Sequence, residues 1–230
     1  MNPIIIALDY QTSKEALDFI EQLSTKNCAL KVGSELFTAC GPDFVRHLVT
    51  SGFRVFLDLK FHDIPNTVAA ACRSAAELGI WMINIHASGG TAMMKAARES
   101  LEGFGSSKPL LIAVTVLTSM NEEAFRETAS KNTVSEQVLH LSSLAWQSGL
   151  DGVVCSAQEA RAIKDITHKD FLAVTPGIRL QGDESHDQQR IMTPAKALQE
   201  GADYLVIGRS VTRAENPKAV LDRIQKETLI

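Results

Sequence analysis

Four charged side chains stand at or near the ends of three apolar segments in the first part of the chain. Asp9 ends the first segment, Lys31 lies in the second, and Asp58 and Lys60 close the third. If the third segment is a β-strand, side chains two residues apart point to the same face, so Asp58 and Lys60 should meet there. Unpaired charge is costly at a buried position. Ammonium and carboxylate groups held together can transfer protons or stabilise charge that develops in a transition state.

Asp63 extends this charged group, three residues after Lys60. The alternative is a structural ion pair between Asp58 and Lys60, with Lys31 as an ordinary solvated amine, because such pairs also occur in clefts. A buried charged cluster, however, stabilises a fold less well than hydrophobic residues of similar volume. The candidate catalytic residues are therefore Lys31, Asp58, Lys60 and Asp63.

The elements that must position these residues follow from the apolar pattern. Eight short runs rich in Ile, Val and Leu occupy residues 4–9, 29–33, 54–60, 82–87, 110–117, 152–157, 172–177 and 204–209. Stretches with helical spacing lie between them, for example at 13–23, 44–50, 67–78, 92–101 and 134–147. Apolar strands that alternate with amphipathic helices are typical of a parallel sheet covered by helices.

Eight such units in 230 residues predict an α/β protein with one (β/α)8 barrel, a TIM barrel, as a single domain over residues 1–230. An open doubly wound sheet is the competing architecture. Its dinucleotide-binding form requires G-x-G-x-x-G after the first strand, and DYQTSKE stands there instead.

In such barrels the carboxyl ends of the strands and the loops that follow them build the active site. The run at 172–177 precedes a long polar loop at 178–190, and the run at 204–209 ends in Gly208 and Arg209. Loops after the seventh and eighth strands commonly bind phosphate. Gly208 allows a close approach to the backbone, and Arg209 can bind a phosphate through two hydrogen bonds. A turn glycine and a surface arginine are the alternative; we predict a phosphate site.

The sequence offers little support for a metal. His62 and His86 lie near the predicted barrel mouth, but they lack the spacing of a catalytic zinc site. The four cysteines are scattered, without metal-ligand spacing, which is typical of buried thiols in a reducing compartment. We predict neither a metal nor another cofactor.

Composition bears on location and partners. The net charge is −4 and no dense Lys/Arg cluster occurs, which argues against a nucleic-acid partner. The start of the chain lacks the basic segment of a signal peptide, and the longest apolar run, at 110–117, is too short to cross a bilayer. These features predict a cytoplasmic protein with no membrane partner.

One ten-residue string is far more specific than these patterns. DLKFHDIPNT at 58–67 closely resembles the motif D-x-K-x-x-D-I-P-N-T of the bacterial orotidine 5′-phosphate decarboxylases. The resemblance runs along the whole chain, from the strand at Asp9 to the turn at Gly208 and Arg209, in the expected order.

The resemblance implies a cofactor-free decarboxylation of orotidine 5′-phosphate to uridine 5′-phosphate. Lys60 would donate the proton to carbon 6 of the pyrimidine, and Asp58 would lie near the substrate carboxylate. Lys31 and Asp63 would hold the charged array and contact the ribose. The other implied substrate-binding residues are Asp9 at the ribose, Thr118 and Ser119 at the end of the fifth strand near the pyrimidine edge, and Pro176, Arg179, Gln188, Gly208 and Arg209 on the phosphate side. The resemblance also implies a homodimer in which Asp63 and Thr67 reach into the neighbouring subunit's site.

Two other functions remain open on the sequence. Sugar-phosphate decarboxylases and aldolases that use magnesium share the D-x-K-x-x-D core, although the I-P-N-T continuation and Thr118-Ser119 favour the orotidylate enzymes. A non-catalytic phosphate-binding barrel is the second alternative, because a fold alone does not determine a function. Such a protein would have little reason to keep two lysines and two acids at its mouth.

Overall fold

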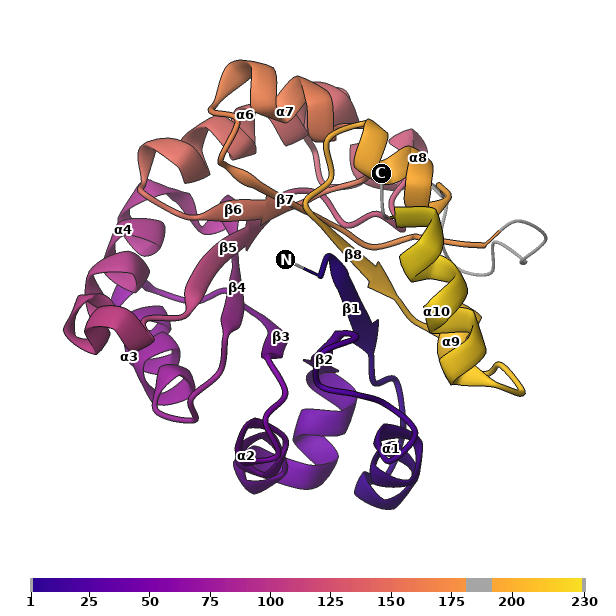
Figure 1. Ribbon diagram of the computed structural model, residues 1–230. Helices are drawn as coiled ribbons and strands as arrows, with labels where there is room; N and C mark the ends of the chain where they lie inside the picture. The colour runs from indigo at the N-terminus through magenta and orange to yellow at the C-terminus, as the bar shows by residue number, and fades with distance from the viewer. Residues whose placement is uncertain (1, 181–191, 229–230) are drawn as a thin grey trace.

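Eight parallel strands form the centre of the computed structural model, which describes residues 2–180 and 192–228. They are β1 (Ile4–Ala7), β2 (Ala29–Gly33), β3 (Val55–Phe61), β4 (Met82–His86), β5 (Leu110–Val114), β6 (Gly152–Val154), β7 (Leu172–Thr175) and β8 (Tyr204–Ile207). Each strand pairs with the next, and β1 also pairs with β8 through Ile4 opposite Leu205, which closes the barrel. The predicted (β/α)8 barrel is confirmed (Figure 1).

Helices surround the ring of strands on its outside (Figure 1). The described α-helices are α1 (Ser13–Ile20), α2 (Ser34–Thr50), α3 (Pro65–Ala76), α4 (Gly90–Ser100), α5 (Glu122–Arg126), α6 (Val134–Gln147), α7 (Ala160–Ile166), α8 (Pro194–Gln199), α9 (Arg209–Thr212) and α10 (Pro217–Thr228). Two 3₁₀ segments, η1 (Ala87–Gly89) and η2 (Glu102–Ser107), flank α4. Both α1 and α6 begin with a capping box, formed by Thr12 with Glu15 and by Thr133 with Glu136.

Side chains pack in two layers. A small cluster lies inside the barrel and includes Phe56, Met82, Ile112 and Val206. A much larger cluster joins the outward-facing strand residues to the helices, and Leu57 belongs to it. Because the inside of the barrel is filled with side chains, an open site can form only at an end of the barrel.

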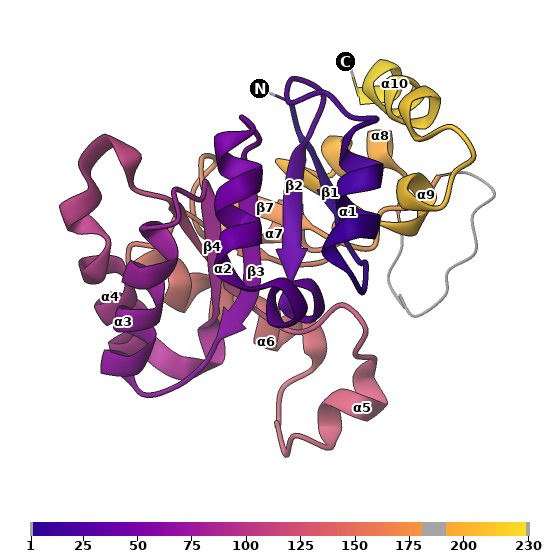
Figure 2. The same ribbon diagram turned by 90° about the horizontal axis from the view of Figure 1, so that it is seen from below.

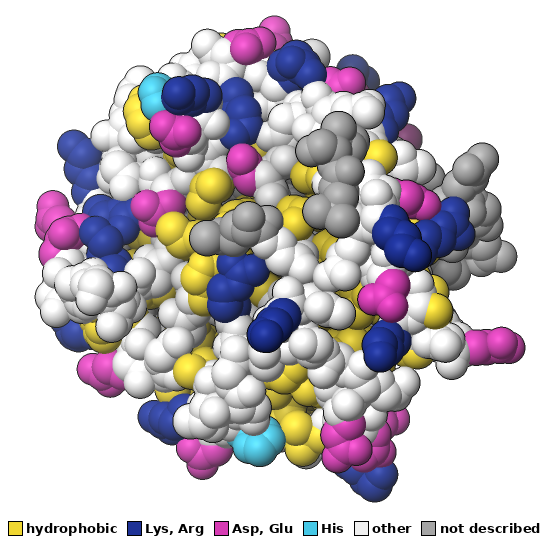
Figure 3. All heavy atoms as spheres, viewed as in Figure 1, with side chains coloured by type: hydrophobic (Ala, Val, Ile, Leu, Met, Phe, Trp, Pro, Cys, Tyr) yellow, Lys and Arg dark blue, Asp and Glu magenta, His cyan; other side chains and the backbone are white. Residues whose placement is uncertain are grey.

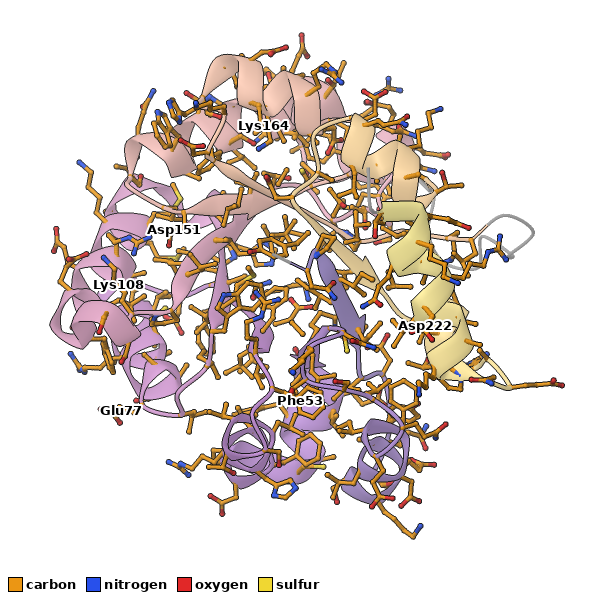
Figure 4. All side chains as sticks on the ribbon, viewed as in Figure 1. Phe53, Glu77, Lys108, Asp151, Lys164 and Asp222 are labelled. Atoms are coloured by element: carbon orange, nitrogen blue, oxygen red, sulfur yellow. The ribbon has the colours of Figure 1, made fainter. Side chains whose placement is uncertain are left out.

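The two ends of the barrel differ. Both chain termini lie at the end where the strands begin, and α5 projects from the end where they finish (Figure 2). Figure 3 looks along the barrel from the first of these ends, where Lys and Arg side chains alternate with Asp and Glu around the rim. Around the barrel wall, Asp151 and Lys164 (labelled in Figure 4) form ion pairs with Arg98 and Asp203. These pairs tie helices to strand starts rather than facing the barrel mouth.

Several predicted boundaries were wrong at the carboxyl ends of strands. The first strand ends at Ala7 rather than at Asp9, and the fifth ends at Val114 rather than at residue 117. Thr118 and Ser119 therefore lie in the loop after β5, not on the strand. The reason is that apolar residues continue past the last ladder hydrogen bond to line the barrel mouth, so the apolar pattern alone overestimates the strand length.

The second helix also differs from the prediction, which began it at residue 44. It begins at Ser34 and includes a break at Gly41, whose φ is 71°, followed by Pro42. A glycine followed by a proline is typical of a helix end, and here it joins two helical segments instead. Over the described residues, no helix is long and apolar enough to span a membrane.

Candidate active site

A cavity of about 250 Å³ opens where the strands end. Its floor includes Phe56 and Val206, which also belong to the cluster inside the barrel. Most of the residues expected in the site line this cavity: Asp9, Lys31, Asp58, Lys60, Thr118, Ser119, Pro176, Arg179, Gly208 and Arg209. The barrel thus brings together residues that are up to 200 positions apart in the chain, from Asp9 to Arg209.

Charged side chains from β2, β3 and the loop after β1 meet on one wall of the cavity. Lys60 Nζ lies 2.7 Å from Asp58 Oδ1, and Lys31 Nζ lies 3.2 Å from Asp58 Oδ2. Asp9 Oδ1 lies 3.6 Å from the same Lys31 Nζ. Asp58 is therefore held between two ammonium groups. The predicted meeting of Asp58 with Lys60 is confirmed.

The protonation of Asp58 reflects two opposing influences. Burial, the largest of them, disfavours the charged carboxylate. The ammonium groups of Lys31 and Lys60, together with hydrogen bonds from Lys60 and Asn84, outweigh burial and hold the pKa of Asp58 below its ordinary value. Asp58 is thus an anion at neutral pH, and its buried charge lies in the wall of the cavity.

Asn84 is a site residue that sequence reasoning missed. It lies on β4, is fully buried, and donates from Nδ2 to Asp58 Oδ1 at 2.6 Å. Its Oδ1 accepts the backbone N–H of Lys60 at 2.8 Å. The available signal was a polar residue in the middle of the apolar run MINIHA.

The loops after β7 and β8 border the same cavity. Pro176, Gly177 and Arg179 follow β7, and Gly208 and Arg209 follow β8. Arg179 is buried, and its Nη1 donates to the carbonyl oxygen of Ile178. Gln188, the remaining residue expected on this side, lies outside the described residues.

Two expected residues do not line the cavity within this chain. Asp63 is exposed in the turn after β3, where its carboxylate accepts the N–H of Ile64. Thr67 is exposed in the first turn of α3. Ile64, between them, is the most exposed large hydrophobic residue in the described part of the chain, at 66%. Within this chain, neither Asp63 nor Thr67 contributes to the lining of the cavity.

The two histidines near the mouth lie side by side. The rings of His62 and His86 have centroids 5.3 Å apart. Burial, and then the neighbouring His62 and Lys60, lower the pKa of His86.

In the described ranges, no three His, Cys, Asp or Glu side chains are grouped so as to hold a metal ion. Ser88 to Gly90 lie where η1 leads into α4.

Comparisons with known proteins cover nearly the whole chain. The model of the orotidine 5′-phosphate decarboxylase / HUMPS family matches residues 2–224. The orotidine 5′-phosphate decarboxylase of Pseudoalteromonas atlantica is 58% identical over 221 residues, 96% of each chain. That of Legionella pneumophila is 55% identical over 224 residues, which are 97% of this chain and 98% of the relative.

Two solved structures are similar to this chain over nearly its whole length. The crystal structure of orotidine 5′-phosphate decarboxylase from Lactobacillus acidophilus superposes with a TM-score of 0.89 at 38% identity, and covers 100% of both chains. An uncharacterized conserved protein from Geobacillus kaustophilus superposes with a TM-score of 0.87 at 43% identity, covering 98% of this chain and 100% of the other.

Proposed function

Because this chain belongs to the orotidine 5′-phosphate decarboxylase / HUMPS family, we propose that it is a carboxy-lyase that converts orotidine 5′-phosphate to uridine 5′-phosphate. This reaction is the last step of UMP biosynthesis. The observation that carries the proposal is the cluster of Lys31, Asp58 and Lys60 at the mouth of the barrel. The named relatives match over nearly their full length and favour this reaction over the magnesium-dependent sugar-phosphate reactions.

The chemistry explains why the site needs fixed charge. When carbon dioxide leaves carbon 6, the electron pair of the broken bond stays in an sp² orbital, which the pyrimidine ring delocalises poorly. Ammonium groups placed beforehand near carbon 6 stabilise that developing charge without reorganising during the step. Lys60 Nζ then donates a proton to carbon 6 as the general acid.

Asp58 has a complementary role in the proposal. Its carboxylate stays ionised because its pKa is held below the ordinary value. Beside the substrate carboxylate it repels the ground state, and this repulsion disappears as neutral carbon dioxide leaves. Asp58 also holds Lys60 and Lys31 in position through the two ion pairs.

The rest of the cavity binds the nucleotide in this proposal. Asp9 and Lys31 contact the ribose, and Thr118 and Ser119 contact the pyrimidine edge. The phosphate side consists of Pro176, Arg179, Gln188, Gly208 and Arg209, of which Gln188 is proposed on the family resemblance alone. Binding energy from the phosphate, remote from carbon 6, helps to hold the substrate in the reactive geometry.

We further propose a homodimer with shared sites. Asp63 and Thr67 are exposed and lie outside their own chain's cavity, next to the exposed Ile64. A two-fold interface would present this segment to the partner's barrel mouth, and the partner's segment to this one. A cytoplasmic location is also proposed, because scattered cysteines, three of the four buried, suit a reducing compartment.

The phosphate side can be tested with one arginine. Arg209→Ala should lower kcat/KM by about 10²-fold, because a hydrogen-bonded charge pair with the phosphate is lost. Steady-state kinetics on orotidine 5′-phosphate measure the change. Arg213→Ala, an exposed position just beyond α9, is the matched control and should keep wild-type kinetics. If orotidine without its phosphate reacted as well as the nucleotide, the phosphate role of these loops would be wrong.

The reaction itself can be tested by metal removal. Purified protein in metal-free buffer with a chelator should release carbon dioxide from orotidine 5′-phosphate at its full rate, because the proposed chemistry uses only side-chain charges. Measuring carbon dioxide and uridine 5′-phosphate together checks the stoichiometry. No turnover, with or without added Mg²⁺, would refute the proposed function; a rate that depends on Mg²⁺ would favour a sugar-phosphate enzyme and its substrates.

A further inference from the structure

We propose that Asn84 is a positioning residue for the decarboxylation. Its side chain holds the Asp58 carboxylate and the Lys60 backbone in fixed positions relative to each other. The inference rests on the proposed function. It adds a residue that lies behind the charged cluster, outside the set of cavity-lining residues.

The hydrogen bonds of Asn84 determine its orientation. The backbone N–H of Lys60 requires an acceptor, and the ionised carboxylate of Asp58 requires a donor. Only one orientation of the amide meets both requirements: Oδ1 toward Lys60 N at 2.8 Å and Nδ2 toward Asp58 Oδ1 at 2.6 Å. One buried side chain therefore joins the two residues that the reaction needs most.

The backbone of β3 explains why such a link is needed. The pairing of β3 with β4 shifts between Leu57, opposite Ile83, and Phe61, opposite Ile85. Three residues of β3 thus face a single residue of β4, which is Asn84. Within this bulge Lys60 has a φ of 52°, in the left-handed region that residues with a Cβ rarely adopt.

The bulge removes ladder hydrogen bonds at the point where the catalytic groups stand. The Asn84 amide supplies one hydrogen bond in their place, because its Oδ1 accepts the backbone N–H of Lys60. It also fixes the rotamer of the carboxylate. Asp58 Oδ1 contacts both Lys60 Nζ and Asn84 Nδ2, whereas Asp58 Oδ2 contacts Lys31 Nζ. Without the amide, the carboxylate can rotate and the Lys60 ammonium loses its fixed position.

Asn84→Asp tests this role through its pH dependence. The new carboxyl would keep the acceptor for Lys60 N–H but place an oxygen against Asp58. Burial and the Asp58 anion raise the pKa of the new group, whereas the ammonium groups of Lys31 and Lys60 oppose the rise. His86 on β4 and His62 after β3 are the other titratable groups nearby.

The protonation state of the new carboxyl determines how the kcat of Asn84→Asp should change with pH. Above its pKa the new group is an anion that repels Asp58, and kcat should fall by about 10²-fold, the effect of a small misplacement of reacting groups. Below its pKa its O–H donates to Asp58 as the amide did. The kcat of Asn84→Asp, relative to wild type, should therefore rise as the pH falls from about 8 to about 5.

Asn84→Leu is the second variant, because it has a similar volume and no hydrogen-bonding group. Its kcat should fall by about 10²-fold at every pH, without recovery in acid. Both variants should bind uridine 5′-phosphate nearly as wild type does, since the phosphate side is intact. The control is Thr115→Val, which removes the side-chain hydrogen bond from a buried residue just beyond β5 to Val154 O; like Asn84, Thr115 does not line the cavity. It should lower the melting temperature and leave kcat unchanged.

The outcomes separate the possibilities. Loss of kcat with retained uridine 5′-phosphate binding, and acid recovery only in Asn84→Asp, support the proposal. Wild-type kcat in both variants, or a loss in Asn84→Asp with no pH dependence, overturns it. Failure of both variants to fold also overturns it, because Asn84 then serves the fold rather than the catalytic geometry. If wild-type protein does not decarboxylate orotidine 5′-phosphate, the proposed function fails instead.

Discussion

Lys60→Ala is expected to lower the kcat for decarboxylation by about 10⁴-fold or more while leaving the protein folded. The loss combines two effects: the ammonium that stabilises the developing carbanion and the general acid that protonates carbon 6 are the same group. The Lys60 side chain is partly exposed in the cavity, so the substitution removes little packing. Single-turnover kinetics and a thermal melt measure the two parts of the prediction.

A surface lysine serves as the control. Lys108 lies at the periphery of the barrel (Figure 4) and forms an ion pair with Glu102 at 3.0 Å. Lys108→Ala should keep the wild-type rate, which separates the loss of a catalytic ammonium from the loss of any positive charge. Near-normal turnover by Lys60→Ala, with a solvent proton still delivered to carbon 6, would assign the proton transfer to another group.

Mixing two inactive variants is expected to restore activity. Lys60→Ala lacks the general acid, and Asp63→Ala lacks the carboxylate that we propose to act in the partner's site. In a mixed dimer, one site receives intact Lys60 from one chain and intact Asp63 from the other, while the second site carries both defects. With random exchange about half of the dimers are mixed, and each mixed dimer has one intact site. About a quarter of all sites in the mixture should therefore be active.

The experiment requires proof that subunits exchange. Native mass spectrometry of the mixture, with one variant isotopically labelled, gives the fraction of mixed dimers, and activity should increase in proportion to it. Lys60→Ala mixed with Lys108→Ala provides a matched reference, because Lys108 belongs to neither site. If mixed dimers form and activity stays at the level of the parent variants, Asp63 does not complete a partner's site.

Much of the fold could be predicted because its signals are local. Alternating apolar runs and helical spacing involve residues a few positions apart, and β2 and α6 have the predicted bounds. The start of the second helix was not predicted: α2 begins at Ser34 rather than at residue 44, because Gly41 and Pro42 interrupt the regular helical spacing between its two segments.

The sequence by itself supplied most of the polar groups near the strand ends, and a side-chain period of two predicted that Asp58 and Lys60 share a face. The two side chains do meet, but Lys60 lies in a bulge of β3 rather than in a regular strand. The tertiary structure decided what these groups contact. Asn84 reaches Asp58 across 26 residues of chain, at a bulge that no local pattern predicted, and Asp63 stays outside the cavity although it lies only three residues beyond Lys60. The physical reason is that strand periodicity specifies directions along one segment, whereas barrel closure and the register between neighbouring strands arise from pairing between distant segments.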